Sequence, residues 1–193
     1  MRIFLLARHG QSLFNVDGVV NGDPLLDRGL SERGIEEAEK LGGQVAHVAI
    51  DVLIVSPFPR AVQTANIALD GRDVPHVVDS ELGDVRIGDF EGKTLAEYRA
   101  SVPHADPTLR FTGGESLYEA ALRYAGAYER ILAREEAVTL VLCHEIPVRY
   151  AVNTAMGSDD LNAPIHDIAN ATPYVFDEDG LQRAVEGIRR VAS

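Results

Sequence analysis

Two histidines and two arginines of this 193-residue chain have the chemistry to hold a tetrahedral anion. A neutral histidine is a competent nucleophile toward phosphorus, and a protonated histidine stabilises charge on phosphoryl oxygens. Arginine binds such oxygens through a rigid, permanently charged fork. Arg8, His9, Arg60 and His144 therefore suit a phosphoryl-transfer site whose cations are side chains, with no metal and no cofactor required.

Each of these residues also has a simpler interpretation when it is taken alone. Arg8 and His9 could be an ordinary polar pair at the surface. Arg60 could be an exposed charge at the start of a helix, and His144 could be a core histidine that bonds to the backbone. One common site is favoured because all four residues follow apolar runs.

Those apolar runs predict buried strands. Val, Ile and Leu dominate Ile3–Ala7, Val52–Val55 and Val138–Cys143, as in the strands of a sheet that is covered on both faces. The carboxyl ends of parallel strands meet at one edge of a sheet, where α/β proteins bind their ligands. We therefore expect the two histidines and the two arginines to converge at that edge.

Segments of helical period separate the predicted strands. Apolar residues recur at steps of three to five over residues 30–45, and Ser31 is a suitable N-cap. A second helical stripe follows Pro59. The capping box of Ser116–Glu119 opens a further helix, which we expect to run to Leu132.

The expected fold is an α/β three-layer sandwich in one domain, residues 1–193. It has a mainly parallel central sheet with helices on both faces and an antiparallel C-terminal edge hairpin. The hairpin is predicted because the apolar runs 174–176 and 181–185 flank an Asp-Gly turn at 177–180. Residues 88–114 are the least regular, and we expect them to form a cap or lid over the site.

The composition limits the expected partners and compartment. With a net charge of −12, neither a nucleic acid nor an anionic membrane is an expected partner, whereas a homodimer is left open. No apolar run approaches the roughly 18 residues of a membrane span.

The single cysteine, Cys143, excludes an intramolecular disulfide, is expected in the core and agrees with a cytoplasmic location. The remaining histidines have no metal-ligand spacing: His47, His76, His104 and His166.

Six short motifs, in order along the chain, resemble those of the histidine phosphatase superfamily, also called phosphoglycerate mutase-like. A lone Arg-His-Gly would be weak evidence, but an ordered set from residue 5 to about residue 150 is specific. The motifs are Arg8-His9-Gly10-Gln11-Ser12 with Asn15, Leu30-Ser31-Glu32-Arg33-Gly34 with Ala38, Ser56-Pro57-Phe58-Pro59-Arg60-Ala61-Val62-Gln63-Thr64-Ala65, Gly88-Asp89-Phe90-Glu91-Gly92, Gly113-Gly114-Glu115-Ser116, and Val141-Leu142-Cys143-His144 with Arg149.

The resemblance implies a role for each matching residue. His9 would be the nucleophile that becomes phosphohistidine. Neighbouring cations would complete the pocket that holds the phosphate. Those neighbours would be Arg8, Arg60 and His144. The residues expected to contact the substrate are Ser12, Asn15, Asn21 and Gly22.

The chain departs from the family at the proton donor. The family has a glutamate four residues before the Gly that corresponds to Gly88 and two after a leucine, here Leu82. Both counts reach Asp84, whose side chain is one methylene shorter. Asp84 is therefore the expected general acid, with Glu81 as the substitute candidate.

We expect a metal-independent phosphomonoester hydrolase that acts on a small phosphorylated metabolite. The first alternative is a phosphoglycerate mutase, for which Arg99 or Arg110 of the expected lid would hold a second anionic group. The second is a phosphate-binding or interaction protein with weak catalysis, as the change at Asp84 suggests. A metal hydrolase ranks last. Specificity should come from the lid, where Tyr98 and Phe111 are candidates for the mouth and residues 101–107 are expected to be exposed.

Overall fold

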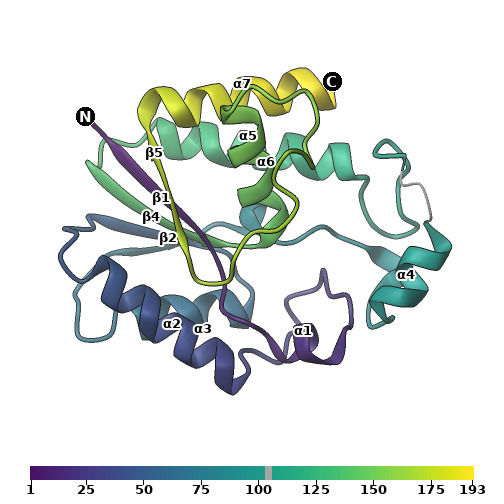
Figure 1. Ribbon diagram of the computed structural model, residues 1–193, viewed down its shortest axis with the longest axis horizontal. Helices are drawn as coiled ribbons and strands as arrows, with labels where there is room; N and C mark the ends of the chain where they lie inside the picture. Colours follow the sequence, from purple (N-terminus) through teal and green to yellow (C-terminus); the bar gives the residue numbers. More distant parts are fainter. Residues whose placement is uncertain (103–105) are drawn as a thin grey trace.

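A computed structural model describes residues 1–102 and 106–193, and its centre is a five-stranded sheet (Figure 1). The strand order is β3-β2-β4-β1-β5; β5 is antiparallel to β1, and the other pairs are parallel. The predicted mainly parallel sheet with an antiparallel edge is confirmed. The strands are β1 (Ile3–Arg8), β2 (Val52–Val55), β3 (His76–Val78), β4 (Val138–Cys143) and β5 (Pro173–Asp177).

Helices cover both faces of this sheet, as predicted. In Figure 1, α2 (Glu32–Val45) and α3 (Pro59–Ala68) lie below the sheet. The helices above the sheet are α5 (Leu117–Leu132), α6 (Glu145–Ala155) and α7 (Glu178–Ala192). The short helices are α1 (Leu13–Asp17), η1 (Ser80–Leu82), η2 (Gly88–Phe90) and α4 (Leu95–Ser101).

The sheet separates two apolar cores because strand side chains alternate between its faces. In β1, Phe4 and Leu6 pack into the core under α5, α6 and α7. Leu5 and Ala7 pack into the core shared with α2 and α3. Burial on both faces explains why the strands are continuous apolar runs rather than alternating ones.

Side-chain caps begin the main helices where the sequence predicted them. The Ser31 side chain accepts a hydrogen bond from the Gly34 backbone N–H at the start of α2. Ser116 and Glu119 form the predicted capping box of α5, and the helix ends at Leu132. These caps satisfy backbone N–H groups that a helix start would leave without partners.

The predicted C-terminal hairpin is wrong, because its second arm is helix α7. Asp177 does not open a turn; its carboxylate accepts from the Gly180 backbone N–H and caps the helix. The buried residues Leu181, Ala184 and Ile188 follow at helical spacing. The segment 177–180 thus begins a helix, with Asp177 as the N-cap. Only β5 supplies the antiparallel edge.

Residues 88–102 and 106–114, from the segment expected to be a cap, include η2 and α4, and Figure 1 shows α4 apart from the sheet. Phe90, Tyr98 and Phe111 make edge-to-face contacts that hold α4 to the loops around it. Phe111 is buried, which makes it a packing residue rather than part of a mouth. His104 and part of the segment 101–107 lie outside the described residues.

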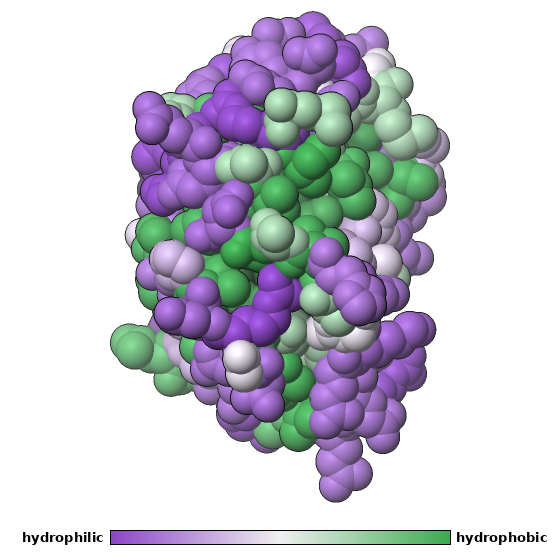
Figure 2. All heavy atoms as spheres, turned by 90° about the vertical axis from the view of Figure 1, so that its left-hand side faces the viewer, coloured by the Kyte–Doolittle hydropathy of each residue, from purple (hydrophilic) through white to green (hydrophobic). Residues whose placement is uncertain are grey.

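The opposite end of the molecule, where the strands begin, is shown in Figure 2. Apolar side chains gather mainly across the middle of that face, between hydrophilic regions above and below. Ile3, Val48 and Val138 are partly buried and pack against the core shared with α2 and α3. Within the described ranges, no helix combines the length and the apolar character that crossing a bilayer needs.

A contact between two glycines fixes the loop that follows β1. A Cβ atom built on Gly34 would lie 2.0 Å from the carbonyl oxygen of Gln11, and one on Gly10 would lie 2.4 Å from the carbonyl oxygen of Gly34. The start of α2 therefore touches the backbone next to His9. Only glycine permits this approach.

We predict that Gly34→Ala lowers the free energy of unfolding by about 1–3 kcal/mol, because the new methyl group must displace the loop backbone. The matched control is Gly43→Ala on the same helix, where a Cβ meets nothing within 4 Å. That variant should be more stable than the wild type by about 0.5–1 kcal/mol. Urea unfolding of both variants tests the prediction, and equal stabilities would contradict it.

Candidate active site

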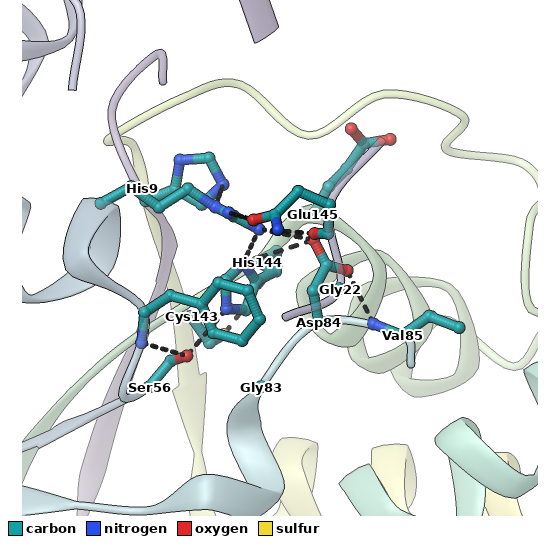
Figure 3. Close-up of polar contacts among 12 residues, drawn as sticks. His9, Gly22, Ser56, Gly83, Asp84, Val85, Cys143, His144 and Glu145 are labelled. Atoms are coloured by element: carbon teal, nitrogen blue, oxygen red, sulfur yellow. Dashed lines mark hydrogen bonds and ion pairs between the residues drawn. The ribbon is translucent and has the colours of Figure 1, made fainter. Parts of the chain in front are cut away.

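The carboxyl ends of β1, β2 and β4 open into a cavity of about 320 Å³. Arg8 and His9 reach it from the end of β1, and Arg60 reaches it from the first turn of α3. His144 follows β4 at the start of α6. Figure 3 shows His9, His144 and Asp84 lying around one point, although they come from three separate segments. The expected convergence of the strand ends is therefore found.

His9 presents one ring nitrogen that is free of a proton. Its Nδ1 atom lies 2.6 Å from the carbonyl oxygen of Gly10 and must donate to it, since a carbonyl only accepts. Its Nε2 atom lies 3.0 Å from Nε of Arg60 and must accept, since an arginine only donates. Burial and the Arg60 cation lower the pKa of His9 well below its ordinary value. His9 is thus a neutral imidazole with its Nε2 lone pair at the cavity.

Arg60 holds this arrangement together. Its guanidinium is buried and donates to Nε2 of His9, to the side-chain oxygen of Asn21 at 2.6 Å and to the Asp84 carboxylate at 3.0 Å. Behind it, the fully buried Asp27 carboxylate lies 3.4 Å from Nη1 and accepts the Arg60 backbone N–H at 2.9 Å. One side chain therefore orients four segments of the chain.

His144 is buried between Arg60 and Ser56. Its Nε2 atom lies 2.8 Å from the Ser56 hydroxyl, and its Nδ1 atom lies 3.2 Å from Nη2 of Arg60 (Figure 3). Burial and the Arg60 cation lower the pKa of His144 well below its ordinary value. Burial thus favours a neutral His144, and the protonated form expected from the sequence would need a negative charge such as that of a phosphate beside it.

Asp84, and not Glu81, lies at the cavity. The Asp84 carboxylate is 3.0 Å from Arg60 and 3.4 Å from Nδ1 of His144. The Glu81 side chain pairs with Arg86 outside the cavity. Arg123 fixes the loop between them, because its guanidinium donates to the carbonyl oxygens of Glu81, Gly83 and Asp84.

Arg8 belongs to a second group of charges at the cavity wall. Its Nη1 atom donates to the carbonyl oxygen of Ile168 at 2.8 Å and lies 3.0 Å from the Glu145 carboxylate. The other Glu145 oxygen accepts from Arg149 at 2.7 Å. Glu145 therefore bridges two arginines.

Of the four residues expected to contact the substrate, three line the cavity. Ser12 and Asn15 do so from a capping box at the start of α1, in which the Asn15 side-chain oxygen is already used. Asn21 lines the cavity and orients Arg60. Gly22 does not line it, because its N–H donates to Glu91 at 2.9 Å and its Cα packs against the Val85 carbonyl.

Several residues that support the site had no sequence-based assignment. Asp27 forms an ion pair with Arg60. Glu91 accepts a hydrogen bond from the backbone N–H of Gly22 and so fixes the loop at 21–22. Thr64 accepts the Gly10 backbone N–H at 3.0 Å, and Asn170 donates to the His9 carbonyl at 2.7 Å. Only Glu91 and Thr64 fall inside recognisable motifs. Asp27 and Asn170 carry no local signal of their tertiary contacts.

The remaining candidate groups lie apart from this chemistry. Cys143 is buried, as predicted for a core thiol, and burial raises its pKa to about 12. Across residues 1–102 and 106–193, no three His, Cys, Asp or Glu side chains are grouped as metal ligands. His47, His76 and His166 do not line the cavity.

Two buried neutral histidines should make the fold sensitive to acid. The pKa of each is lower in the folded chain than in the unfolded chain, so the unfolded chain binds more protons below about pH 6.5. The free energy of unfolding should therefore fall as the pH falls, by about 1.4 kcal/mol per histidine between pH 7.5 and 5.5. Urea unfolding in phosphate-free buffer measures this loss. His9→Ala should remove about half of it, and a stability that stays constant would contradict the assignment.

Comparison with known proteins places this geometry in context. The chain matches the model of the histidine phosphatase superfamily (branch 1) over residues 4–190. The 2,3-bisphosphoglycerate-dependent phosphoglycerate mutase of Thermoplasma acidophilum is 25% identical over 177 residues, which are 92% of this chain and 88% of that protein. Phosphoserine phosphatase 1 of Hydrogenobacter thermophilus is 28% identical over 163 residues, which are 80% and 76% of the two chains.

A solved structure shows the same arrangement of elements. Bacillus stearothermophilus YhfR superposes with a TM-score of 0.80 at 27% identity, covering 92% of this chain and 91% of that one. The family model spans nearly the whole chain, and Arg8, His9 and Arg60 line one cavity with His144 in contact with Arg60. The chain therefore belongs to the histidine phosphatase superfamily (branch 1).

Proposed function

We propose that this protein is a phosphomonoester hydrolase that forms a phosphohistidine intermediate on His9. The observation that carries the proposal is the unprotonated Nε2 atom of His9, held 3.0 Å from the Arg60 guanidinium at a buried cavity wall. This pairs a nucleophile with a cation that can bind the group it attacks. Relatives with phosphatase names, such as phosphoserine phosphatase 1 of Hydrogenobacter thermophilus, support the same reaction class.

In the first step, the phosphate of the ester takes over the donors of Arg8 and Arg60. Nε2 of His9 then attacks phosphorus in line, the P–N bond forms and the P–O bond to the leaving group breaks. Asp84 gives a proton to the departing oxygen.

In the second step, water replaces the leaving group. The Asp84 carboxylate accepts a proton from this water, whose oxygen attacks phosphorus. The P–N bond breaks, inorganic phosphate forms and neutral His9 is restored. Asp84 thus acts as acid and then as base, and His144, which lies beside Arg60 and Asp84, would help to stabilise charge on the phosphoryl oxygens.

A mutase would have to return the phosphate to a substrate that carries another anionic group. Relatives with mutase names exist, such as the Thermoplasma acidophilum protein. The arginines expected to serve that purpose do not line the cavity: Arg110 pairs with Glu119, and Arg99 lies on the exposed side of α4. This favours hydrolysis. A pure phosphate binder is disfavoured because binding does not require a neutral nucleophile at the cavity.

We expect the wild type to release phosphate from phosphomonoesters in the presence of EDTA, and His9→Ala to be at least about a thousandfold slower, since the covalent route is lost. A malachite-green assay over a panel of esters measures both proteins. Labelling with a ³²P-labelled substrate, quenched in alkaline detergent because the P–N bond is labile in acid, should mark the wild type and not the variant. Near-normal turnover by His9→Ala would contradict the mechanism.

Loss of the proton donor should depend on the leaving group. Asp84→Asn should slow alkyl phosphates by about 10²–10⁴-fold, the usual contribution of general acid catalysis. Measured as kcat/KM, which reports only the steps through departure of the leaving group, p-nitrophenyl phosphate cleavage should slow far less, because nitrophenolate leaves without a proton. Asp84→Glu, which keeps the carboxyl group, is the matched control and should keep most of the activity on both substrates. An equal loss on both substrates in Asp84→Asn would argue against proton donation.

A further inference from the structure

Each arginine at the cavity already has a carboxylate partner. Arg60 is paired with Asp27 and Asp84. Arg8 and Arg149 share a single carboxylate, that of Glu145, at 3.0 and 2.7 Å. Binding of one phosphate uses Arg8 and Arg60, and the remaining cation, Arg149, is neutralised by Glu145.

Glu145 has a fixed place at the cavity wall. It follows His144 directly and occupies the first turn of α6, where the helix dipole favours an anion (Figure 3). Its side chain is 28% exposed and lines the cavity, whereas Arg8 and Arg149 are each 16% exposed. The proposed reaction leaves this carboxylate without a chemical role.

Much of the remaining cavity wall is apolar, although Ser12, Asn15 and Arg149 also line it. Val20, Leu95, Tyr98, Leu117 and Ile146 form its walls. Leu95 is 37% exposed at this wall. Among the described residues, no lysine lines the cavity. A leaving group would therefore meet mainly carbon atoms, together with an arginine, Arg149, whose charge Glu145 already offsets.

Resting on the proposed function, we infer that the cavity selects phosphomonoesters with an uncharged, apolar leaving group, and that Glu145 rejects leaving groups that carry a carboxylate. A substrate carboxylate near Arg149 would meet the like charge of Glu145 and would have to displace it. An aromatic or aliphatic leaving group only has to replace water on the apolar walls.

Three substrates test this selection. 1-Naphthyl phosphate has an apolar leaving group, and glycerol 3-phosphate has a polar, uncharged one. 3-Phosphoglycerate resembles the latter but carries a carboxylate. We expect kcat/KM to decrease in that order, with a difference of at least about tenfold between the last two esters, equivalent to about 1.4 kcal/mol.

Two variants should change this ranking. Glu145→Gln keeps the shape but removes the charge, and should reduce the preference for glycerol 3-phosphate over 3-phosphoglycerate by at least about fivefold, as expected for removal of one like charge. Leu95→Lys adds a cation at an exposed wall position and should shift the ratio in the same direction. The matched control is Glu129→Gln, which removes the same charge from an exposed pair with Arg189 away from the cavity. Its ratio should equal that of the wild type.

The outcomes separate this inference from the proposed function. An active wild type that prefers 3-phosphoglycerate, or a Glu145→Gln variant whose ratio is unchanged, would overturn the selection while leaving phosphate hydrolysis intact. A wild type without activity on any of the three esters or on p-nitrophenyl phosphate would overturn the proposed function itself. A ratio shift of equal size in Glu129→Gln would assign the effect to net charge and overturn the role of Glu145.

Discussion

The site depends on one buried cation, the guanidinium of Arg60. A buried charge is costly unless it is paired and hydrogen-bonded. Asp27 supplies the opposite charge through a carboxylate that is itself fully buried. The remaining donors of Arg60 are then directed at His9, Asn21 and Asp84. These residues come from segments far apart in the sequence, so the position of Arg60 sets the relative positions of the groups proposed to react.

The same cation also sets the protonation of the site. Two histidines that flank a buried arginine cannot easily bind protons, and burial adds to this effect. A nucleophilic histidine needs this state, because only the unprotonated ring has a lone pair to offer. The site is therefore prepared for attack before the phosphate arrives. The phosphate brings the negative charge that allows His144 to become protonated when charge accumulates on its oxygens.

The parts of this molecule that were predictable from the sequence are those with local signals. Strand runs such as Val138–Cys143 and the capping box of Ser116 and Glu119 follow from neighbouring residues. The hairpin predicted at residues 177–180 is wrong because the same residues suit both a hairpin turn and a helix N-cap. Packing of α7 on α5 and α6 favours the helix. Asp27 was not identified because its role exists only through a partner 33 residues away.

Glu145 reconciles a strongly acidic chain with a binding site for an anion. With a net charge of −12, the protein repels anions at long range, so only groups inside the cavity can attract them. An Arg8 guanidinium without a partner would bind anions of many kinds. Its pairing with Glu145 holds the guanidinium in place and makes every anion compete with a carboxylate. In the proposed reaction a phosphate dianion binds both Arg8 and Arg60, whereas a single carboxylate at Arg8 would have only the exchange with Glu145 to gain. The acidic partner thus turns a site that would bind anions in general into one that requires a phosphate.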